Sequence, residues 1–163
     1  MVETLTALRR AGVAAAVATL LAGGTAFAGG CPTSKQVAGD AGQAMSDAKA
    51  AGVTDMVIAS TDLSKEAVNV PDRLFRLRRL VVQPGGVVPW HSHGDRPAII
   101  YIVSGQIVEY VSTCAVPIVH KAGEATTETH ATAHWWKNLG KQPAVLLSAD
   151  LFHVKSEHDE HMM

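Results

Sequence analysis

The sequence has little net charge and only two cysteines, and after its first 28 residues it has no apolar run long enough for a membrane-spanning helix. The formal charge of its 163 residues is −1 at neutral pH, so no basic excess is available for nucleic acid or an anionic membrane surface. No internal repeat or low-complexity segment is present. We therefore expect a single domain, and we do not expect nucleic acid as a partner.

The first 28 residues have the features of a secretory signal peptide. Arg9 and Arg10 form a basic start, an apolar stretch rich in Ala, Val and Leu follows, and an A-x-A cleavage site ends at Ala28. The apolar stretch is shorter than the roughly 20 residues that a membrane-spanning helix needs. We predict cleavage after Ala28 and export to the periplasm or to the outside of the cell.

The two cysteines are Cys31 and Cys114. In an oxidising compartment they can pair and tie the N-terminal arm to the body of the protein. The alternative is two independent thiols, because the sequence does not report the distance between them. The pair is therefore a candidate disulfide.

The chain divides into four segments. After the signal peptide, residues 29–71 are expected to form a helix and an arm, with the helix over 34–51 ending at Gly52. Gly39 and Gly42 weaken that helical pattern. Residues 72–152 form the body of the domain, and residues 153–163 form a polar tail that we expect to be flexible.

Short strand-like runs separated by Gly and Pro turns fill the body of the domain. They are predicted at residues 55–59, 74–82, 87–93, 98–103, 106–112, 116–121 and 144–151. Runs of this length and spacing are typical of an antiparallel sandwich or barrel. No helix-length pattern separates them, which argues against alternating β-α units. The predicted fold class is therefore all-β.

A histidine pair, His91-Ser92-His93, is the main functional signal. Side chains alternate along a strand, so His91 and His93 point to the same face. A third histidine, His134, follows about forty residues later. Imidazole nitrogens that converge suit a first-row divalent metal. A metal site is therefore the leading hypothesis.

Two motifs around these histidines resemble those of the cupin superfamily, namely G-x5-H-x-H-x3/4-E-x6-G and G-x5-P-x-G-x2-H-x3-N. The matching positions are Gly85, His91, His93 and Gly105 in the first motif, and Gly123, His134 and Asn138 in the second. The resemblance covers roughly residues 72–152. It implies a small single-domain cupin with a double-stranded β-helix, or jelly-roll barrel, in which His91, His93 and His134 bind the metal. It also allows for a homodimer.

The sequence departs from these motifs at three positions. The glutamate of the first motif falls on Ala98, and the proline and glycine of the second fall on Thr129 and Ala131. A neutral three-histidine set favours Fe, Zn, Ni or Cu over Mg or Mn. Glu128 and then Glu109 are the candidates for a further ligand or acid/base group, and the alternative is that both are solvated carboxylates.

Other residues near the motifs have two interpretations each. Arg96 suits a substrate carboxylate, although an ion pair, with Asp95 adjacent, is the alternative. The tryptophans, Trp90, Trp135 and Trp136, are expected to pack the barrel, and the alternative is stacking on a cyclic substrate. His120 is expected to lie on the surface of a strand.

Three functions fit this sequence. The first is a small metal-dependent oxidoreductase of the dioxygenase type acting on a small molecule, with Glu128 or Arg96 positioning the substrate. The second is an exported small-molecule or metal-binding protein without turnover. The third is a metal-dependent isomerase or lyase that uses Glu128 as its base. Fold alone does not choose among them.

Overall fold

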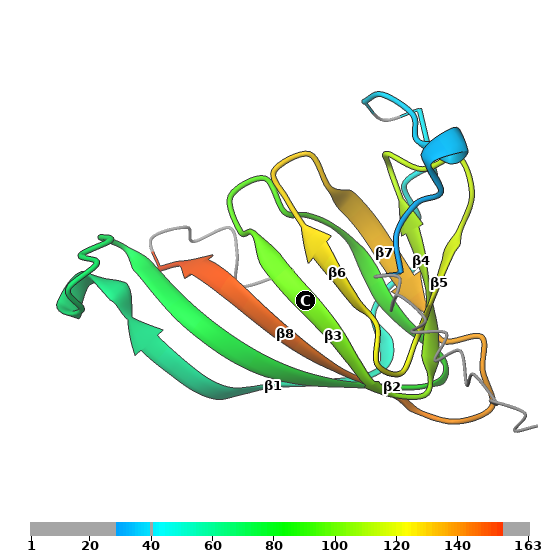
Figure 1. Ribbon diagram of the computed structural model, residues 1–163. Coiled ribbons are helices and arrows are strands. Elements are labelled where there is room, and N and C mark those ends of the chain that lie inside the picture. The colour runs from blue at the N-terminus through cyan, green and yellow to red at the C-terminus, as the bar shows by residue number, and fades with distance from the viewer. Residues whose placement is uncertain (1–28, 40, 155–163) are drawn as a thin grey trace, which may run out of the picture.

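The computed structural model describes residues 29–39 and 41–154 (Figure 1). The predicted signal peptide and all but the first two residues of the predicted tail lie outside this range. Within it, eight strands and two short 3-10 turns are present. The strands are β1 (Ala51–Asp62), β2 (Arg73–Ser92), β3 (Ala98–Ser104), β4 (Gln106–Val111), β5 (Ile118–Lys121), β6 (Ala125–Glu128), β7 (Ala133–Lys137) and β8 (Ala144–His153), and the turns are η1 (Thr33–Lys35) and η2 (Leu63–Lys65).

The strands form one antiparallel sheet that curves into a barrel (Figure 1). Their order is β5-β4-β7-β2-β8-β3-β6, with β1 paired to β2 outside this path. The 20-residue strand β2 connects the sheet, because it pairs with β1 along one part of its length and with β8 and β7 in turn. The predicted all-β jelly-roll barrel is confirmed. No helix among the described residues is long and apolar enough to cross a membrane.

The glycines of both sequence motifs adopt a backbone conformation that favours glycine, Gly85 within β2 and the other two between strands. Gly85, Gly105 and Gly123 have φ values of 77°, 76° and 89°. This left-handed region carries a steric penalty for residues with a β-carbon. At Gly105, which joins β3 to β4, a β-carbon would also lie 2.6 Å from the carbonyl oxygen of Pro143. The motif spacing therefore reflects backbone geometry at these positions.

The predicted helix over residues 34–51 is wrong. The described part of this stretch holds only the turn η1 and otherwise non-helical backbone, and β1 begins at Ala51. Its backbone groups bond to the end of β4 instead of to one another: the amide of Gly42 donates to the carbonyl of Ser112 at 2.8 Å. A β-carbon on Gly42 would lie 2.4 Å from that same oxygen. The glycine is needed for close packing of the arm on the barrel.

A disulfide joins the arm to the barrel. Cys31 and Cys114 are bonded, with their Cα atoms 5.7 Å apart and a sequence separation of 83. Cys114 is fully buried and packs with Val111 and Ile118 in a small apolar cluster. The bond explains how a segment with little regular structure stays in contact with the body of the protein.

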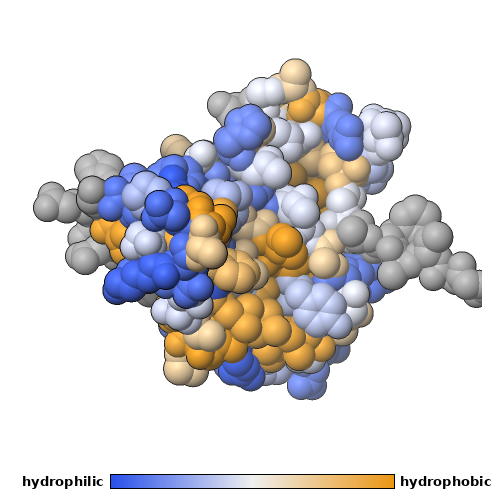
Figure 2. Space-filling view, turned by 60° about the vertical axis from the view of Figure 1, so that its left-hand side comes forward, coloured by the Kyte–Doolittle hydropathy of each residue, from blue (hydrophilic) through white to orange (hydrophobic). Residues whose placement is uncertain are grey.

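The segment between the arm and the barrel is part of the sheet. The prediction of a strand at 55–59 was too short, since β1 runs for 12 residues and pairs with β2 from Ala51 opposite Val87 to Asp62 opposite Leu74. Most of β1 is exposed, and its large apolar side chains Met56 and Ile58 reach the surface. Figure 2 shows apolar and charged areas side by side on one face of the molecule. The homodimer stays a prediction.

The inward side chains of two central strands change from apolar to charged along the barrel. In β8 every second residue faces inward, from Ala144 and Leu146 to Ser148 and Asp150. The matching row of β2 runs from Val82 to Arg76 across the same pairs. One end of the barrel therefore holds the aliphatic core, and the other end holds charged groups. The three histidines lie near the boundary between the two.

Candidate metal centre

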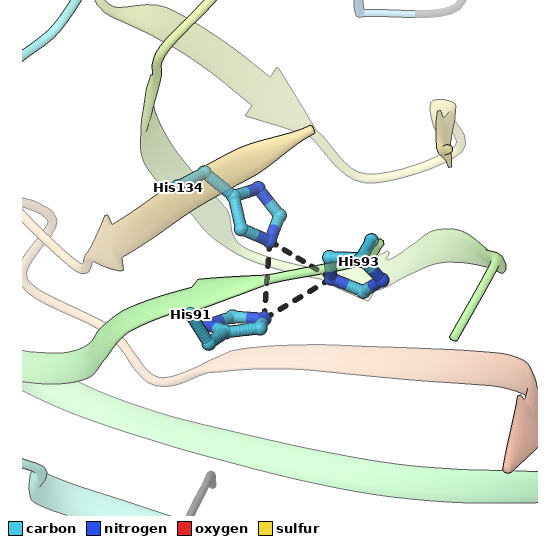
Figure 3. Close-up of side chains that lie close together, drawn as sticks. All are labelled: His91, His93 and His134. Atoms are coloured by element: carbon cyan, nitrogen blue, oxygen red, sulfur yellow. Dashed lines mark hydrogen bonds between the residues drawn. The ribbon is translucent and has the colours of Figure 1, made fainter. Parts of the chain in front are cut away.

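His91, His93 and His134 point toward one another inside the barrel (Figure 3). His91 lies on β2 directly opposite His134 on β7, and His93 follows the end of β2. The three Nε2 atoms are each 3.1 Å from the other two. All three side chains are buried. Strand pairing brings together histidines that are 43 residues apart in the sequence.

Each of the three imidazoles has a hydrogen-bond acceptor on its other nitrogen. Nδ1 of His91 lies 2.9 Å from the carbonyl oxygen of Pro89, and Nδ1 of His93 lies 2.8 Å from that of Arg96. A carbonyl oxygen only accepts, so both Nδ1 atoms carry the proton. Nδ1 of His134 donates in the same way to Oε1 of Glu109 at 2.6 Å. All three Nε2 atoms therefore point toward one another, on the side opposite these acceptors.

This arrangement fits a metal ion. Nitrogen ligands bound at 2.0–2.1 Å to one metal lie roughly 2.9–3.4 Å apart, which brackets the separations of the Nε2 atoms. Burial and the neighbouring His134 hold the pKa of His91 well below its usual value, and they lower the pKa of His93 to about 3. These two imidazoles are thus neutral at physiological pH, as ligands must be.

Glu109 and His120 form a second buried pair behind His134, and the sequence did not predict the contact between them. Glu109 on β4 accepts from His134 through one oxygen and from Nε2 of His120 on β5, at 2.8 Å, through the other. Burial acts to raise the pKa of Glu109, but the hydrogen bonds from His120 and His134 lower it to about 2. The prediction that His120 lies on the surface is wrong, because its side chain is fully buried.

Glu128 lies on the same side of His134 as Glu109. Its Oε2 is 3.5 Å from Nδ1 of His134, and its Oε1 is buried without a hydrogen-bond partner. Burial, followed by the charge of Glu109, raises the pKa of Glu128 well above its usual value. Glu109, Glu128 and His134 also bring ligand atoms within 4.8 Å of one another. Glu128 is directly opposite Ala98, the position where the cupin motif has its glutamate.

Two cavities lie near the histidines, and His134 lines one of them. The first, which we call the metal-side cavity, has a volume of about 70 Å³ and is lined by the three histidines, by Arg78, Arg96 and Asp55, and by mainly apolar side chains that include Trp136. The second, which we call the polar cavity, measures about 200 Å³ and is lined by Glu109, Glu128, several threonines and the arm residues Gly30 and Cys31. Arg96 therefore shares the histidines' cavity, and Glu128 lines the other one.

The tryptophans divide between packing and the site. Trp136 is buried in the main apolar cluster and also lines the metal-side cavity. Trp135 stacks on Tyr110, with ring centroids 4.1 Å apart. Trp90 is half-buried.

The buried carboxylate at Glu109 had a detectable signal in the sequence. Its strand alternates, and Ile107 and Val111, two positions before and after it, are buried apolar residues. A carboxylate in such a row faces the interior and needs a partner. That partner could not be read from the sequence, because His120 and His134 lie on two different neighbouring strands.

An antiparallel barrel with a buried three-histidine cluster in its wall defines a jelly-roll protein whose site fits a metal ion. Residues 78–150 match the family model of the cupin domain, which agrees with the jelly-roll fold and the resemblance found in the sequence. The predicted family is thereby confirmed.

Known relatives match part of the chain. A germin-like protein (subfamily 2 member 2) of Arabidopsis thaliana is 33% identical over 76 residues, which are 45% of this chain and 35% of that protein. Nectarin-1 of Nicotiana langsdorffii x Nicotiana sanderae is 30% identical over 76 residues, 45% of this chain and 33% of its own length. The chain therefore spans about a third of the length of the curated relatives it matches. A solved structure described as a predicted oxalate decarboxylase of Thermotoga maritima superposes with a TM-score of 0.49 at 23% identity, covering 61% of this chain and 80% of that one.

Proposed function

We propose that the protein holds one divalent transition metal ion, Fe, Zn, Ni or Cu, through Nε2 of His91, His93 and His134. The observation that carries this proposal is the convergence of the three Nε2 atoms, each on a ring whose other nitrogen has a hydrogen-bond acceptor. Outer hydrogen bonds of this kind orient histidine ligands and set their tautomer in metal sites. The three nitrogens have no carboxylate within their own cluster of ligand atoms in the described residues.

For the reaction, we propose a small oxidoreductase of the dioxygenase type that acts on a small molecule. A redox-active metal held by three protein ligands would supply an open position and electrophilic or one-electron chemistry there. Arg96 lines the same cavity and is the proposed substrate-positioning residue. The isomerase or lyase alternative relied on Glu128 as a base, and this residue lines the polar cavity instead. The binding protein without turnover is the second candidate, since the histidines alone support both.

Export is part of the proposal. It rests on the signal-peptide features of the first 28 residues and on the disulfide between Cys31 and Cys114, since disulfides persist in oxidising compartments.

Metal analysis tests this proposal directly. Purified protein offered iron, zinc, nickel and copper in turn should retain about one ion per chain of at least one of them. His91→Ala combined with His93→Ala should abolish this retention, because one nitrogen ligand cannot hold the ion. His130→Ala is the matched control, since His130 is exposed and belongs to neither cluster. Retention by the double variant would place the metal elsewhere and overturn the assignment.

Oxygen uptake separates the two leading functions. Iron- or copper-loaded protein should consume dissolved oxygen in the presence of a substrate drawn from a panel of small molecules. Tight binding of a panel compound with no oxygen uptake and no product would instead favour the binding protein.

A further inference from the structure

The polar cavity is lined by acidic, hydroxyl and apolar side chains, and none of its lining residues is arginine, lysine or histidine. Glu109 on β4 and Glu128 at the end of β6 are its two carboxylates. The threonines in its wall are Thr113, Thr126, Thr127 and Thr132. The cavity therefore gathers negative charge and hydroxyl oxygens around a volume of about 200 Å³.

The carboxylate of Glu128 is only partly satisfied by its surroundings. Its side chain is 1% exposed, and its Oε1 has no hydrogen-bond partner among the described residues. Its Oε2 lies 3.5 Å from Nδ1 of His134, but that nitrogen already donates to Glu109 at 2.6 Å. A buried acceptor without a partner costs free energy. A positively charged partner inside the cavity would remove that cost.

The two carboxylates are close enough to share one ion. Glu109, Glu128 and His134 each place a possible ligand atom within 4.8 Å of the other two. Oxygen atoms bound to one calcium ion at about 2.3–2.6 Å lie at most roughly 5 Å apart. The proton on Nδ1 of His134 excludes this nitrogen as a ligand, whereas each oxygen of Glu109 keeps a further lone pair beyond the hydrogen bond it accepts.

A cation would also balance the two carboxylates against each other. Burial, followed by the charge of Glu109, raises the pKa of Glu128. A cation bound between the two would offset both causes, because it supplies the charge that burial and the like-charged neighbour make necessary. The arm residues at this cavity, Gly30 and Cys31, bring no basic side chain that could do the same.

We propose that the polar cavity binds a divalent cation of the calcium and magnesium class between Glu109 and Glu128, with threonine hydroxyls and water as its further ligands. Carboxylate, hydroxyl and water oxygens suit these ions, whereas imidazole nitrogens suit transition metals. The site is separate from the three-histidine cluster and goes beyond the proposed function, because it does not require the histidines to hold a metal.

Calorimetric titration of chelator-treated protein with calcium chloride, and separately with magnesium chloride, tests the proposal. About one ion of at least one kind should bind per chain, with a dissociation constant below about 1 mM. The same ion should raise the urea midpoint of wild-type protein, because it binds the folded state. Absence of binding by both ions up to about 10 mM overturns the proposal, as does an unchanged urea midpoint.

Variants assign the bound ion to the cavity. Glu128→Gln should weaken binding by about tenfold or more, because it removes a ligand charge and replaces one oxygen by a group that only donates. Glutamine has nearly the same shape as glutamate, and circular dichroism verifies the fold. The matched control is Glu66→Gln, since Glu66 is exposed and lines neither cavity. Full affinity in folded Glu128→Gln protein, or an equal loss in Glu66→Gln, overturns the proposal.

Zinc uptake by the same preparation separates this site from the three-histidine cluster. If calcium or magnesium binds and no zinc is taken up, the cavity site stands and the histidine site is wrong. If zinc is taken up and neither calcium nor magnesium binds, the reverse holds. A loss of calcium affinity in the His91→Ala and His93→Ala double variant as large as that in Glu128→Gln would place calcium at the histidines and overturn the proposal.

Discussion

The two cavities near His134 differ in charge, in polarity and in what encloses them. The metal-side cavity is mainly apolar, has two arginines in its wall and is closed partly by β1. The polar cavity contains two carboxylates and a set of threonines, and its outer wall is the disulfide-bonded arm. The His134 ring lines only the first cavity, and its Nδ1 donates to Glu109, which lines the second.

The difference shows how the site separates two tasks. Negative charge is placed behind the ligand, where it fixes the tautomer of His134, and it is absent from the ligand cluster itself. A carboxylate among the ligands would lower the net charge at the metal. Three predictions test whether the two sides are as independent as this division implies.

The largest expected effect comes from the covalent wall of the polar cavity. Replacing both Cys31 and Cys114 by serine opens a loop with an 83-residue separation, and the free energy of unfolding should fall by about 3–4 kcal/mol. Urea unfolding measures this change. The affinity for metal should change by less than about threefold, because Gly30 and Cys31 at the disulfide line only the polar cavity.

The control for this experiment is reduction of wild-type protein with dithiothreitol, which should reproduce the loss of stability without any substitution. A large loss of metal affinity in folded, disulfide-free protein would show that the arm holds His134 in place through the polar cavity. The structures of the two cavities would then depend on each other.

An intermediate effect is expected at Glu109. In Glu109→Gln only one oxygen remains, and the new amide group faces an imidazole N–H as a second donor. Either His134 or His120 then loses its acceptor, so the metal affinity should fall by about 10- to 100-fold. Competition with a chelator of known affinity measures this change, and the visible spectrum of cobalt-substituted protein reports a changed ligand geometry. An unchanged affinity and spectrum would mean that Glu109 has only a structural role.

Features that follow local patterns along the chain were predictable from the sequence, and features that depend on contacts between distant residues were not. Most strands and the histidine pair were predictable, because alternation, turn residues and motif spacing are local patterns. The short strands β6 and β7 were not predicted, and the two strands predicted at 74–82 and 87–93 form the single strand β2. The arm was not, because its alanines and glutamines favour a helix, whereas Gly42 and the disulfide hold it against β4. Propensity was overridden there by contacts with distant residues.

The buried polar groups were the harder part. His120 reads as an outward residue on a short strand, and only its pairing opposite Ile107 places it inside beside Glu109. The network around Asp150 likewise depends on β2 and β8 lying in register, with Arg76 opposite Asp150. Register between distant strands is a tertiary property. A single sequence indicates which residues alternate, but not which partners they meet.

The smallest effect is expected at Glu128, the other carboxylate beside His134. Its 3.5 Å separation from Nδ1 is too long for a strong hydrogen bond, so Glu128→Gln should leave the metal affinity within about twofold of wild type.

The free energy of unfolding should respond to pH instead. Burial raises the pKa of Glu128 in the folded state above the usual value of 4.5, so the folded protein binds a proton that the unfolded chain releases. Wild-type stability is therefore lost as pH rises from about 4.5 toward that raised pKa, whereas the glutamine variant escapes this loss. Urea unfolding between pH 4 and pH 8 should show that the free energy of unfolding of the variant rises relative to that of wild type as the pH increases. Near pH 4 this relative increase should be absent. A loss of metal affinity as large as that of Glu109→Gln would mean that both carboxylates support His134, and the distinction between them would fail.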